Sequence, residues 1–293
     1  MLDSRRLIDP ADAHGGNRSR LTRREALAFA AVAALRAVRT SAQEAALEFD
    51  GIDHVEFYVS QVQRTRDFLS AVFGTAVLVN ASAAKSYVKV GSGYLAFERP
   101  RTEGGPLTTD HVSMAIRNIE MPRVHALLDA KGIAYRDYPS GRDTAILDGD
   151  GIRTQLSPAN GWSLLKPPNF VPDAVVLREQ PVFRATGIEH ILLNVTDPDA
   201  AARFYEKVFG AQSRRLNDRT WFQVGRSRVG LQKTADGEHA GVHHIGVAAE
   251  AFNYDLAVAR LRALGATVER PEIQGAPAFR DPDGMLVQVN AAA

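Results

Sequence analysis

The sequence of 293 residues contains no cysteine. This absence excludes disulfide bonds, thiolate metal ligands and cysteine nucleophiles, and it leaves the redox compartment open. No run approaches the ~20 apolar residues that a membrane-spanning helix needs, so no membrane span is expected. An excess of one charge is also missing, because 35 Lys and Arg face 34 Asp and Glu, and no basic patch indicates binding to nucleic acid. What remains is an ordinary globular composition in a chain long enough for two domains.

The first part of the chain, residues 1–44, differs from the rest because it is rich in arginine. An arginine pair, Arg23 and Arg24, precedes the apolar run 26–35, which small residues around Ser41 follow. This order is typical of a secretory signal peptide, and the arginine pair resembles a twin-arginine signal. We therefore expect an exported protein, periplasmic or extracellular. The alternatives are a disordered N-terminal segment or an arginine-rich amphipathic helix on a cytoplasmic protein.

An internal repeat organises the remainder of the chain. The stretch 51–74, GIDHVEFYVSQVQRTRDFLSAVFG, returns as 187–210, GIEHILLNVTDPDAAARFYEKVFG. Each copy has an alternating apolar run typical of a strand, followed by a helical pattern that ends in Val-Phe-Gly. Weaker copies of the opening occur at 110–116 and 243–249, and short β-like runs follow every helical pattern. The sequence therefore predicts four modules, each made of a strand, a helix and about three strands.

A histidine begins the first strand of every module, and the histidine spacing indicates how the modules pair. His54 and His111 are 57 positions apart, and His190 and His244 are 54 positions apart. His111 and His190, however, are 79 positions apart. The excess falls in 159–185, which contains four prolines and is predicted to be a linker.

The pattern predicts an α+β chain with one domain at 49–158 and a second at 186–291. These features resemble the vicinal oxygen chelate superfamily, which includes glyoxalase I, bleomycin-resistance proteins and extradiol dioxygenases. The resemblance rests on the paired histidine strands and on the turns 148–151 and 281–284, Asp-Gly-Asp-Gly and Asp-Pro-Asp-Gly. It implies four βαβββ modules that form two domains, each with its sheet curled into an open cup. It also implies a metal held by one residue from each first strand and one from each last strand of a domain.

Four residues of the first domain fit that scheme. They are His54, Glu98, His111 and Gln155. Glu98 follows His54 by 44 positions, and Gln155 follows His111 by the same number. Two imidazoles and one carboxylate are a common set for a divalent metal and, with open positions, form the facial triad of non-haem iron(II) oxygenases. We expect a divalent metal here, with iron(II) favoured over zinc, manganese or nickel. Gln155 would add a weak neutral oxygen ligand or only a hydrogen bond.

Three further side chains share the cup wall by strand alternation: Glu56, Tyr58 and Tyr94. Glu98, Glu56 and Tyr58 are the candidate catalytic residues, with Tyr94 as a further candidate for proton transfer. The second domain offers a different set, namely His190, Gln232, His244 and Gln288. Without a carboxylate it is expected to hold no metal and to widen the cup or form a homodimer surface. His243 is expected to face the other way, as a structural residue.

These observations favour an enzyme that chelates a small substrate through two adjacent oxygens, as an extradiol ring-cleaving dioxygenase does. One alternative is a glyoxalase-like lyase, isomerase or epimerase. Another is a metal-free protein that binds a small ligand, of the resistance type. The module pairing also stays open, because pairing the first module with the fourth would unite His54 and Glu98 with His244 and Gln288.

Overall fold

The computed structural model describes residues 47–74, 77–80, 82, 84–173, 181–211 and 213–292. The expected signal segment, 1–44, lies outside these residues, so export stays a prediction. No helix in the described part of the chain is both long and apolar enough to cross a membrane.

The first two modules form one sheet of nine strands, in the order β6-β7-β8-β5-β1-β4-β3-β2-β9. Its strands are β1 (Phe49–Tyr58), β2 (Val77–Asn80), β3 (Lys85–Val90), β4 (Gly93–Glu98), β5 (Thr109–Ile116), β6 (Tyr135–Asp137), β7 (Thr144–Leu147), β8 (Arg153–Pro158) and β9 (Phe170–Pro172). Its helices are α2 (Val62–Phe73) and α3 (Met121–Ala130).

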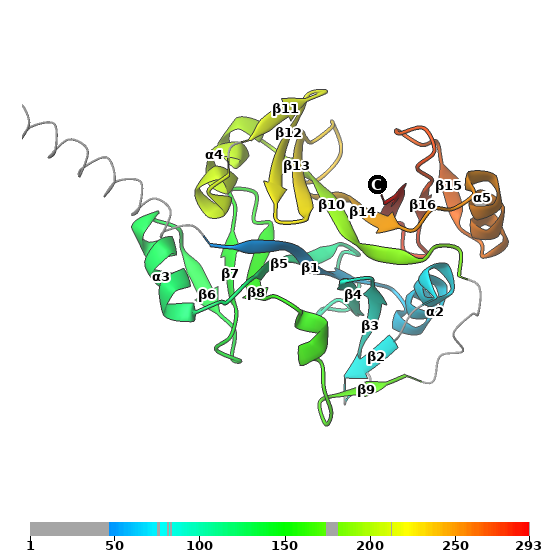
Figure 1. The fold of residues 1–293 in the computed structure, drawn as a ribbon, viewed down its shortest axis with the longest axis horizontal. Coiled ribbons are helices and arrows are strands. Elements are labelled where there is room, and N and C mark those ends of the chain that lie inside the picture. Colours follow the sequence, from blue (N-terminus) through cyan, green and yellow to red (C-terminus); the bar gives the residue numbers. More distant parts are fainter. Residues whose placement is uncertain are drawn as a thin grey trace, which may run out of the picture. The chain divides into compact units, whose positions relative to one another are not determined.

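The last two modules form a sheet of eight strands, in the order β11-β12-β13-β10-β14-β17-β16-β15. Its strands are β10 (Ala185–Val195), β11 (Arg214–Leu216), β12 (Arg219–Val224), β13 (Ser227–Lys233), β14 (Gly241–Ala249), β15 (Thr267–Glu269), β16 (Ala278–Arg280) and β17 (Leu286–Ala291), with helices α4 (Pro198–Phe209) and α5 (Tyr254–Ala263). The predicted α+β fold of four modules is confirmed (Figure 1). Among the described strands, those of the first module share a sheet with the second module and not with the fourth.

Each module folds as its alternation predicts. In β1, Val55 and Phe57 face an apolar core at 0% and 4% exposure, while His54 and Glu56 face the other side of the sheet. The helix that follows ends at Gly74, which adopts the left-handed conformation and donates its N–H to the Ser70 carbonyl. β1 pairs in parallel with β4 and antiparallel with β5, so the first strands of modules one and two lie side by side.

The two halves share one apolar core and brace each other at their turns. Phe68 of α2 packs against Phe279 of β16 with ring centroids 6.0 Å apart. The Asp283 carboxylate, in the turn before β17, accepts a hydrogen bond from the Ser60 N–H at 3.0 Å, just before α2. The corresponding turn of the first half repeats this contact, because Asp150 accepts from the Thr196 N–H at 2.8 Å. Each half therefore fixes a strand-to-helix junction of the other.

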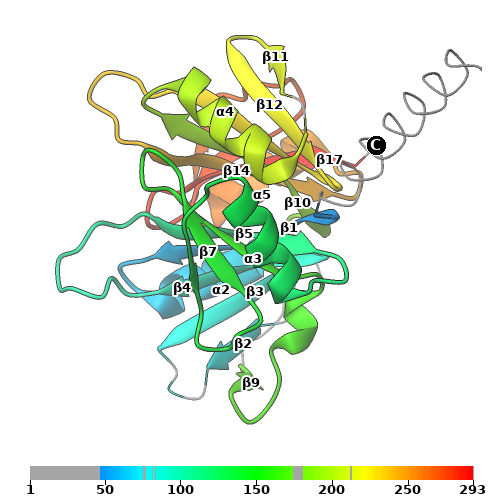
Figure 2. The ribbon, with the colours of Figure 1, turned by 90° about the vertical axis from the view of Figure 1, so that its left-hand side faces the viewer.

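The segment predicted as a linker contributes to the first half instead of merely connecting it to the second. A short 3-10 helix spans Gly161–Leu164, and β9 extends the first sheet by pairing with β2 (Figure 2). Trp162, Leu165 and Phe170 pack on Tyr87 and Tyr94, which line the inner face of β3 and β4. The proline-rich composition did not predict this packing. It covers the part of the first cup that the strands of the first module form; we call the part formed by each module a wing. The domain limits drawn from the sequence stay a prediction.

Candidate metal centre

The two histidines of the first sheet converge on one point. The Nε2 atoms of His54 and His111 are 3.0 Å apart, and both side chains are buried. They come from adjacent antiparallel strands, and the Tyr94 ring stacks on the His54 imidazole with centroids 4.5 Å apart. This juxtaposition of two imidazoles is the one expected from the sequence.

A carboxylate holds the far nitrogen of each ring. Asp53 Oδ2 is 2.8 Å from His54 Nδ1, and Asp110 Oδ2 is 2.8 Å from His111 Nδ1. An ionised carboxylate only accepts hydrogen bonds, so each imidazole must donate from Nδ1 and keep its acceptor lone pair on Nε2. The Gly161 N–H donates to Asp53 Oδ1 at 2.8 Å and anchors that carboxylate. The two Nε2 lone pairs therefore face each other.

Two facing lone pairs repel unless a cation lies between them. That cation is either a proton, which makes one ring an imidazolium, or a metal ion. Burial lowers the pKa of His111, although its hydrogen bond to Asp110 opposes this, so protonation of His111 is disfavoured. The separation also suits two neighbouring ligands of one ion, because bonds of about 2.1 Å at a right angle place their nitrogens about 3 Å apart. The donor set therefore fits a metal.

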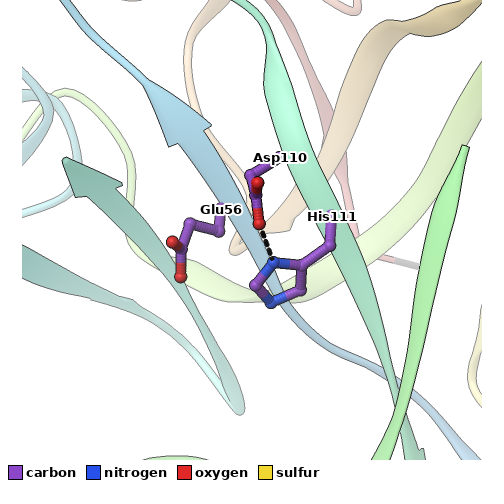
Figure 3. Close-up of side chains that lie close together, drawn as sticks. All are labelled: Glu56, Asp110 and His111. Atoms are coloured by element: carbon purple, nitrogen blue, oxygen red, sulfur yellow. Dashed lines mark hydrogen bonds and ion pairs between the residues drawn. The ribbon is translucent and has the colours of Figure 1, made fainter. Parts of the chain in front are cut away.

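Glu56 is a further carboxylate close to this pair, besides Asp53 and Asp110. Among the described residues, Glu56, Asp110 and His111 form a group whose ligand atoms all lie within 4.8 Å of one another (Figure 3). Burial raises the pKa of Glu56, but its interactions with His111 and Lys85 outweigh burial and leave the pKa below its ordinary value. Glu56 is therefore an anion poised beside His111.

Lys85 occupies the space between two carboxylates. Its Nζ lies 2.5 Å from Glu56 Oε1 and 3.4 Å from Glu98 Oε2. Burial raises the pKa of Glu98, Lys85 opposes this, and the neighbouring Glu56 raises it further. Only one of the two carboxylates thus has close access to an imidazole, while both share the ammonium group.

The strand register places Glu98 away from the position equivalent to Gln155. Gln155 pairs with Ser113, two residues beyond His111, whereas Glu98 pairs with Tyr58, four residues beyond His54. The residues equivalent to Gln155 are Ala96 in β4, Gly230 in β13 and Gln288 in β17, because each pairs with a residue two beyond its histidine. The equal spacing of 44 positions does not mark equivalent sites, since the turns that precede β4 and β8 differ in length.

The remaining candidates of the first domain have supporting positions. The Tyr58 hydroxyl donates to Asp110 Oδ1 at 2.5 Å, so Tyr58 helps to fix the carboxylate that orients His111. Burial and Asp110 raise the pKa of Tyr58, which makes this hydroxyl a poor acid. Gln155 is buried, and among the described residues its amide has no recorded hydrogen-bond partner. It is thus free to face a ligand.

Sequence reasoning missed the supporting residues Asp53, Asp110 and Lys85. The signal for the first two is the dipeptide Asp-His, which begins both histidine strands of the first domain. The second domain has Glu-His and His-His at the same places. Lys85 has no sequence signal, because its contact with Glu56 depends on how the sheet curls.

The second sheet repeats the pair with different support. The Nε2 atoms of His190 and His244 are also 3.0 Å apart, but His244 Nδ1 lies 2.9 Å from His243 Nδ1 and not beside a carboxylate. His243 can donate to His244, which can then donate to His190, so this pair is satisfied without a cation. The expectation that His243 faces away from the site was wrong. Burial and the two neighbouring imidazoles lower the pKa of His244 to about 3.

The second cup also lacks the carboxylate of the first. Leu192 occupies the position of Glu56, and the Trp221 ring lies 5.6 Å from His190. Gln232 and Asn194 bind each other, at 2.7 Å, instead of facing the histidines. The second pair therefore has Glu189 beside His190, with Oε2 3.3 Å from Nδ1, but no carboxylate at the position of Glu56.

Comparisons with known proteins agree with this fold. Residues 187–289 match the model of the Glyoxalase/Bleomycin resistance protein/Dioxygenase superfamily. No curated protein sequence matches the chain. The resemblance to the vicinal oxygen chelate superfamily is confirmed by the family match and by solved structures.

Three solved structures illustrate the likeness. A 2,3-dioxygenase from Pseudomonas sp. KL28 has a TM-score of 0.64 at 13% identity, covering 84% of this chain and 93% of its own. The Mn(II)-bound glyoxalase from Novosphingobium aromaticivorans has a TM-score of 0.61 at 15% identity, covering 84% and 83%. Homoprotocatechuate 2,3-dioxygenase from Brevibacterium fuscum has a TM-score of 0.60 at 13% identity, covering 83% and 81%. At these identities the likeness establishes the fold.

Proposed function

We propose that this chain, a tandem-domain protein of the vicinal oxygen chelate superfamily, is a metal-dependent enzyme whose first cup binds a small substrate through two adjacent oxygens. The reaction we propose is extradiol ring cleavage, with iron(II) as the favoured metal. The observation that carries the proposal is the pair of facing lone pairs on His54 and His111, each fixed by an aspartate. Solved dioxygenases with the same fold support it.

His54, His111 and Glu56 are the residues that would hold the metal. When bound, a divalent ion supplies Lewis-acid stabilisation of an anionic substrate oxygen, and a single carboxylate ligand leaves it a formal charge of +1 for that purpose. Glu98 would then keep its contact with Lys85, whose ammonium group can donate a hydrogen bond to the substrate. Gln155 faces the cup as a neutral hydrogen-bonding group.

Metal content provides the first test. Natively purified protein is expected to contain about one divalent ion per chain by elemental analysis, and His111→Ala and Glu56→Gln are expected to lose it. His244→Ala is the matched control, because it removes the corresponding imidazole of the second cup and should keep the metal. Protein with no bound metal under native conditions, or equal loss from His244→Ala, would contradict the proposal.

The reaction class needs a separate assay. Oxygen uptake with catechols distinguishes a dioxygenase from a glyoxalase-like lyase, isomerase or epimerase, since only the dioxygenase consumes oxygen. Metal-loaded protein that converts a 2-oxoaldehyde adduct without oxygen uptake would move the assignment to the second class.

One observation favours a metal-free binding protein as the second candidate. Lys85 already lies between Glu56 and Glu98, so the two carboxylates have a cation beside them without any metal. On this alternative the cup binds a small ligand without turnover. Lys85→Met separates the two cases. In a metal-free binding protein, Glu56 and Glu98 would lose the cation that neutralises them. A metal enzyme should still bind its metal.

A further inference from the structure

A hollow lies beside the histidine pair, on the wing of the first cup that the second module forms. It has a volume of about 490 Å³, and Tyr138, Arg153 and Ala145 are among the residues that line it. Ala145 pairs directly with Gln155 across β7 and β8, and Arg153 begins β8. The hollow is thus the open part of the inner face of this wing. The other wing is covered by Trp162, which packs on Tyr94.

The hollow adjoins the candidate metal centre through two of its residues. The Tyr138 ring lies 6.5 Å from the His111 ring, centroid to centroid. Arg153 donates from Nη1 to Asp110 Oδ2 at 2.8 Å, the same carboxylate oxygen that holds His111. A small molecule in the hollow would therefore reach the neighbourhood of His111.

Positive charge dominates the wall of the hollow. Three arginines line it, Arg101, Arg136 and Arg153, and the one acidic residue in its wall, Asp137, already pairs with His125 at 2.8 Å. Arg153 pairs with Asp110. Arg101 and Arg136 form no ion pair with any described residue, so two guanidinium groups are left to meet an anion from outside.

The rest of the wall is apolar, with one unused hydroxyl. Leu147 is 57% exposed although it is a large apolar residue, and it lines the hollow together with Ala145 and Pro139. The Tyr138 hydroxyl is buried and has no hydrogen-bond partner among the described residues. A buried hydroxyl without a partner is costly, and a ligand oxygen would satisfy it.

We propose that this hollow binds the carboxylate end of a small organic acid with a flat apolar body. Arg101 and Arg136 bind the carboxylate, Leu147 and Ala145 contact the apolar body, and the Tyr138 hydroxyl donates to a ligand oxygen. This inference rests on the proposed function for one point only: the two adjacent oxygens of the substrate lie at the end of the molecule that faces His111. The substrate class is then an aromatic compound with adjacent hydroxyls and a remote carboxylate.

Binding of simple probes tests the hollow without any metal. Titration calorimetry on the full chain, stripped of metal with a chelator, compares 3-phenylpropionate with its neutral amide. Neither probe has adjacent oxygens, so the result does not depend on the candidate metal centre. The acid is expected to bind at least about tenfold more tightly than the amide, because a hydrogen bond to a charged group contributes more than one to a neutral group. Equal affinities would overturn the proposal.

Two variants test which arginines are involved. Arg136→Gln is expected to weaken binding of 3-phenylpropionate about tenfold or more and to leave binding of the amide unchanged. Arg142→Gln is the matched control, because Arg142 lies nearby, in the connection between β6 and β7, but outside the hollow, and should have no effect. Loss of binding in both variants, or in neither, would overturn the assignment. Circular dichroism and the melting temperature confirm that both variants are folded.

A second probe pair separates this inference from the proposed function. On metal-loaded protein, 3-(3,4-dihydroxyphenyl)propionate is compared with its methyl ester. If the metal centre is absent, the dihydroxy acid should bind no better than 3-phenylpropionate, while the preference for acid over amide remains. If the hollow does not bind carboxylates, the acid and its ester should bind equally, whatever the metal does.

Discussion

Replacing Asp110 by asparagine tests the tautomer argument on which the candidate metal centre depends. The Asp110 carboxylate accepts hydrogen bonds from His111 Nδ1, the Tyr58 hydroxyl and Arg153. Although burial raises its pKa, these hydrogen bonds hold it well below the ordinary value, so the carboxylate is ionised. An asparagine amide can donate as well as accept, and therefore lets His111 move its proton from Nδ1 to Nε2.

With Nε2 protonated, His111 donates directly to His54 and no lone pair is left for a metal. Loss of such an outer partner typically lowers metal affinity 10- to 100-fold. That range corresponds to about 1.4 to 2.8 kcal/mol, since each tenfold change is about 1.4 kcal/mol. We expect the effect of Asp110→Asn to lie toward the upper end, because one oxygen of Asp110 serves both His111 and Arg153.

Chelator competition on the natively folded protein measures this affinity. Asp53→Asn is expected to have a similar but smaller effect, since Asp53 supports His54 with fewer partners. Glu189→Gln, at the corresponding place in the second cup, is the matched control and should leave metal affinity unchanged. Full metal affinity in both Asp110→Asn and Asp53→Asn would refute the reasoning, because the imidazole tautomers would then not matter.

Three predictions concern stability. Burial raises the pKa of Asp281 to about 6 from 3.8, so the contribution of Asp281 to the free energy of unfolding is full below pH 3.8 and is lost as pH rises through 6. Asp281→Asn should therefore shrink the difference in that free energy between pH 4 and pH 8 by about 3 kcal/mol in urea unfolding, and an unchanged difference would contradict this. Tyr205→Phe removes a buried hydroxyl that donates to Asp148 at 2.9 Å, so thermal or urea unfolding should show a loss of about 1 to 3 kcal/mol, and a neutral result would mean that Asp148 finds another donor. Gly91→Ala should be far more destabilising than Gly141→Ala, since both have positive φ but the new Cβ would lie 1.9 Å from the Thr186 backbone only in the first; equal losses would mean that the backbone yields there.

The fold could be predicted from the sequence because the repeat carries it. The same strand and helix pattern occurs at 51–74 and 187–210, and each copy buries one face of a strand against one face of a helix. Such local periodicity fixes secondary structure and module order. The long gap between His111 and His190 then indicated which modules share a sheet, since loop length limits which strands can pair.

The candidate site was predicted only in part, because counting residues does not determine strand register. Two residues, 91 and 92, connect β3 to β4, but five residues, 148–152, connect β7 to β8. Residues that follow their histidine by the same number of positions therefore lie at different places along the paired strands. Glu98 consequently lies beside Tyr58, and Glu56, not Glu98, lies close to His111.

Contacts between distant segments were also beyond the sequence pattern. The position of Lys85 beside Glu56 follows from the curl of the sheet, and the anchoring of Asp53 by Gly161 follows from the path of the chain after β8. Neither pair has a regular spacing. The packing of Trp162 into the cup likewise depends on tertiary structure, although its segment has a composition typical of connections.

The contacts of Asp283 with Ser60 and of Asp150 with Thr196 tie each half to the other. Substitutions should therefore be tolerated differently in the interior of the second cup and on its outer surface. The interior of the second cup serves no metal in our scheme and can accept new side chains at little cost. Its outer surface cannot, because it completes the junctions and the apolar packing of the first cup. A truncated protein that ends before β10 should therefore aggregate, and a redesigned second cup could be given a new ligand while the first continues its own chemistry.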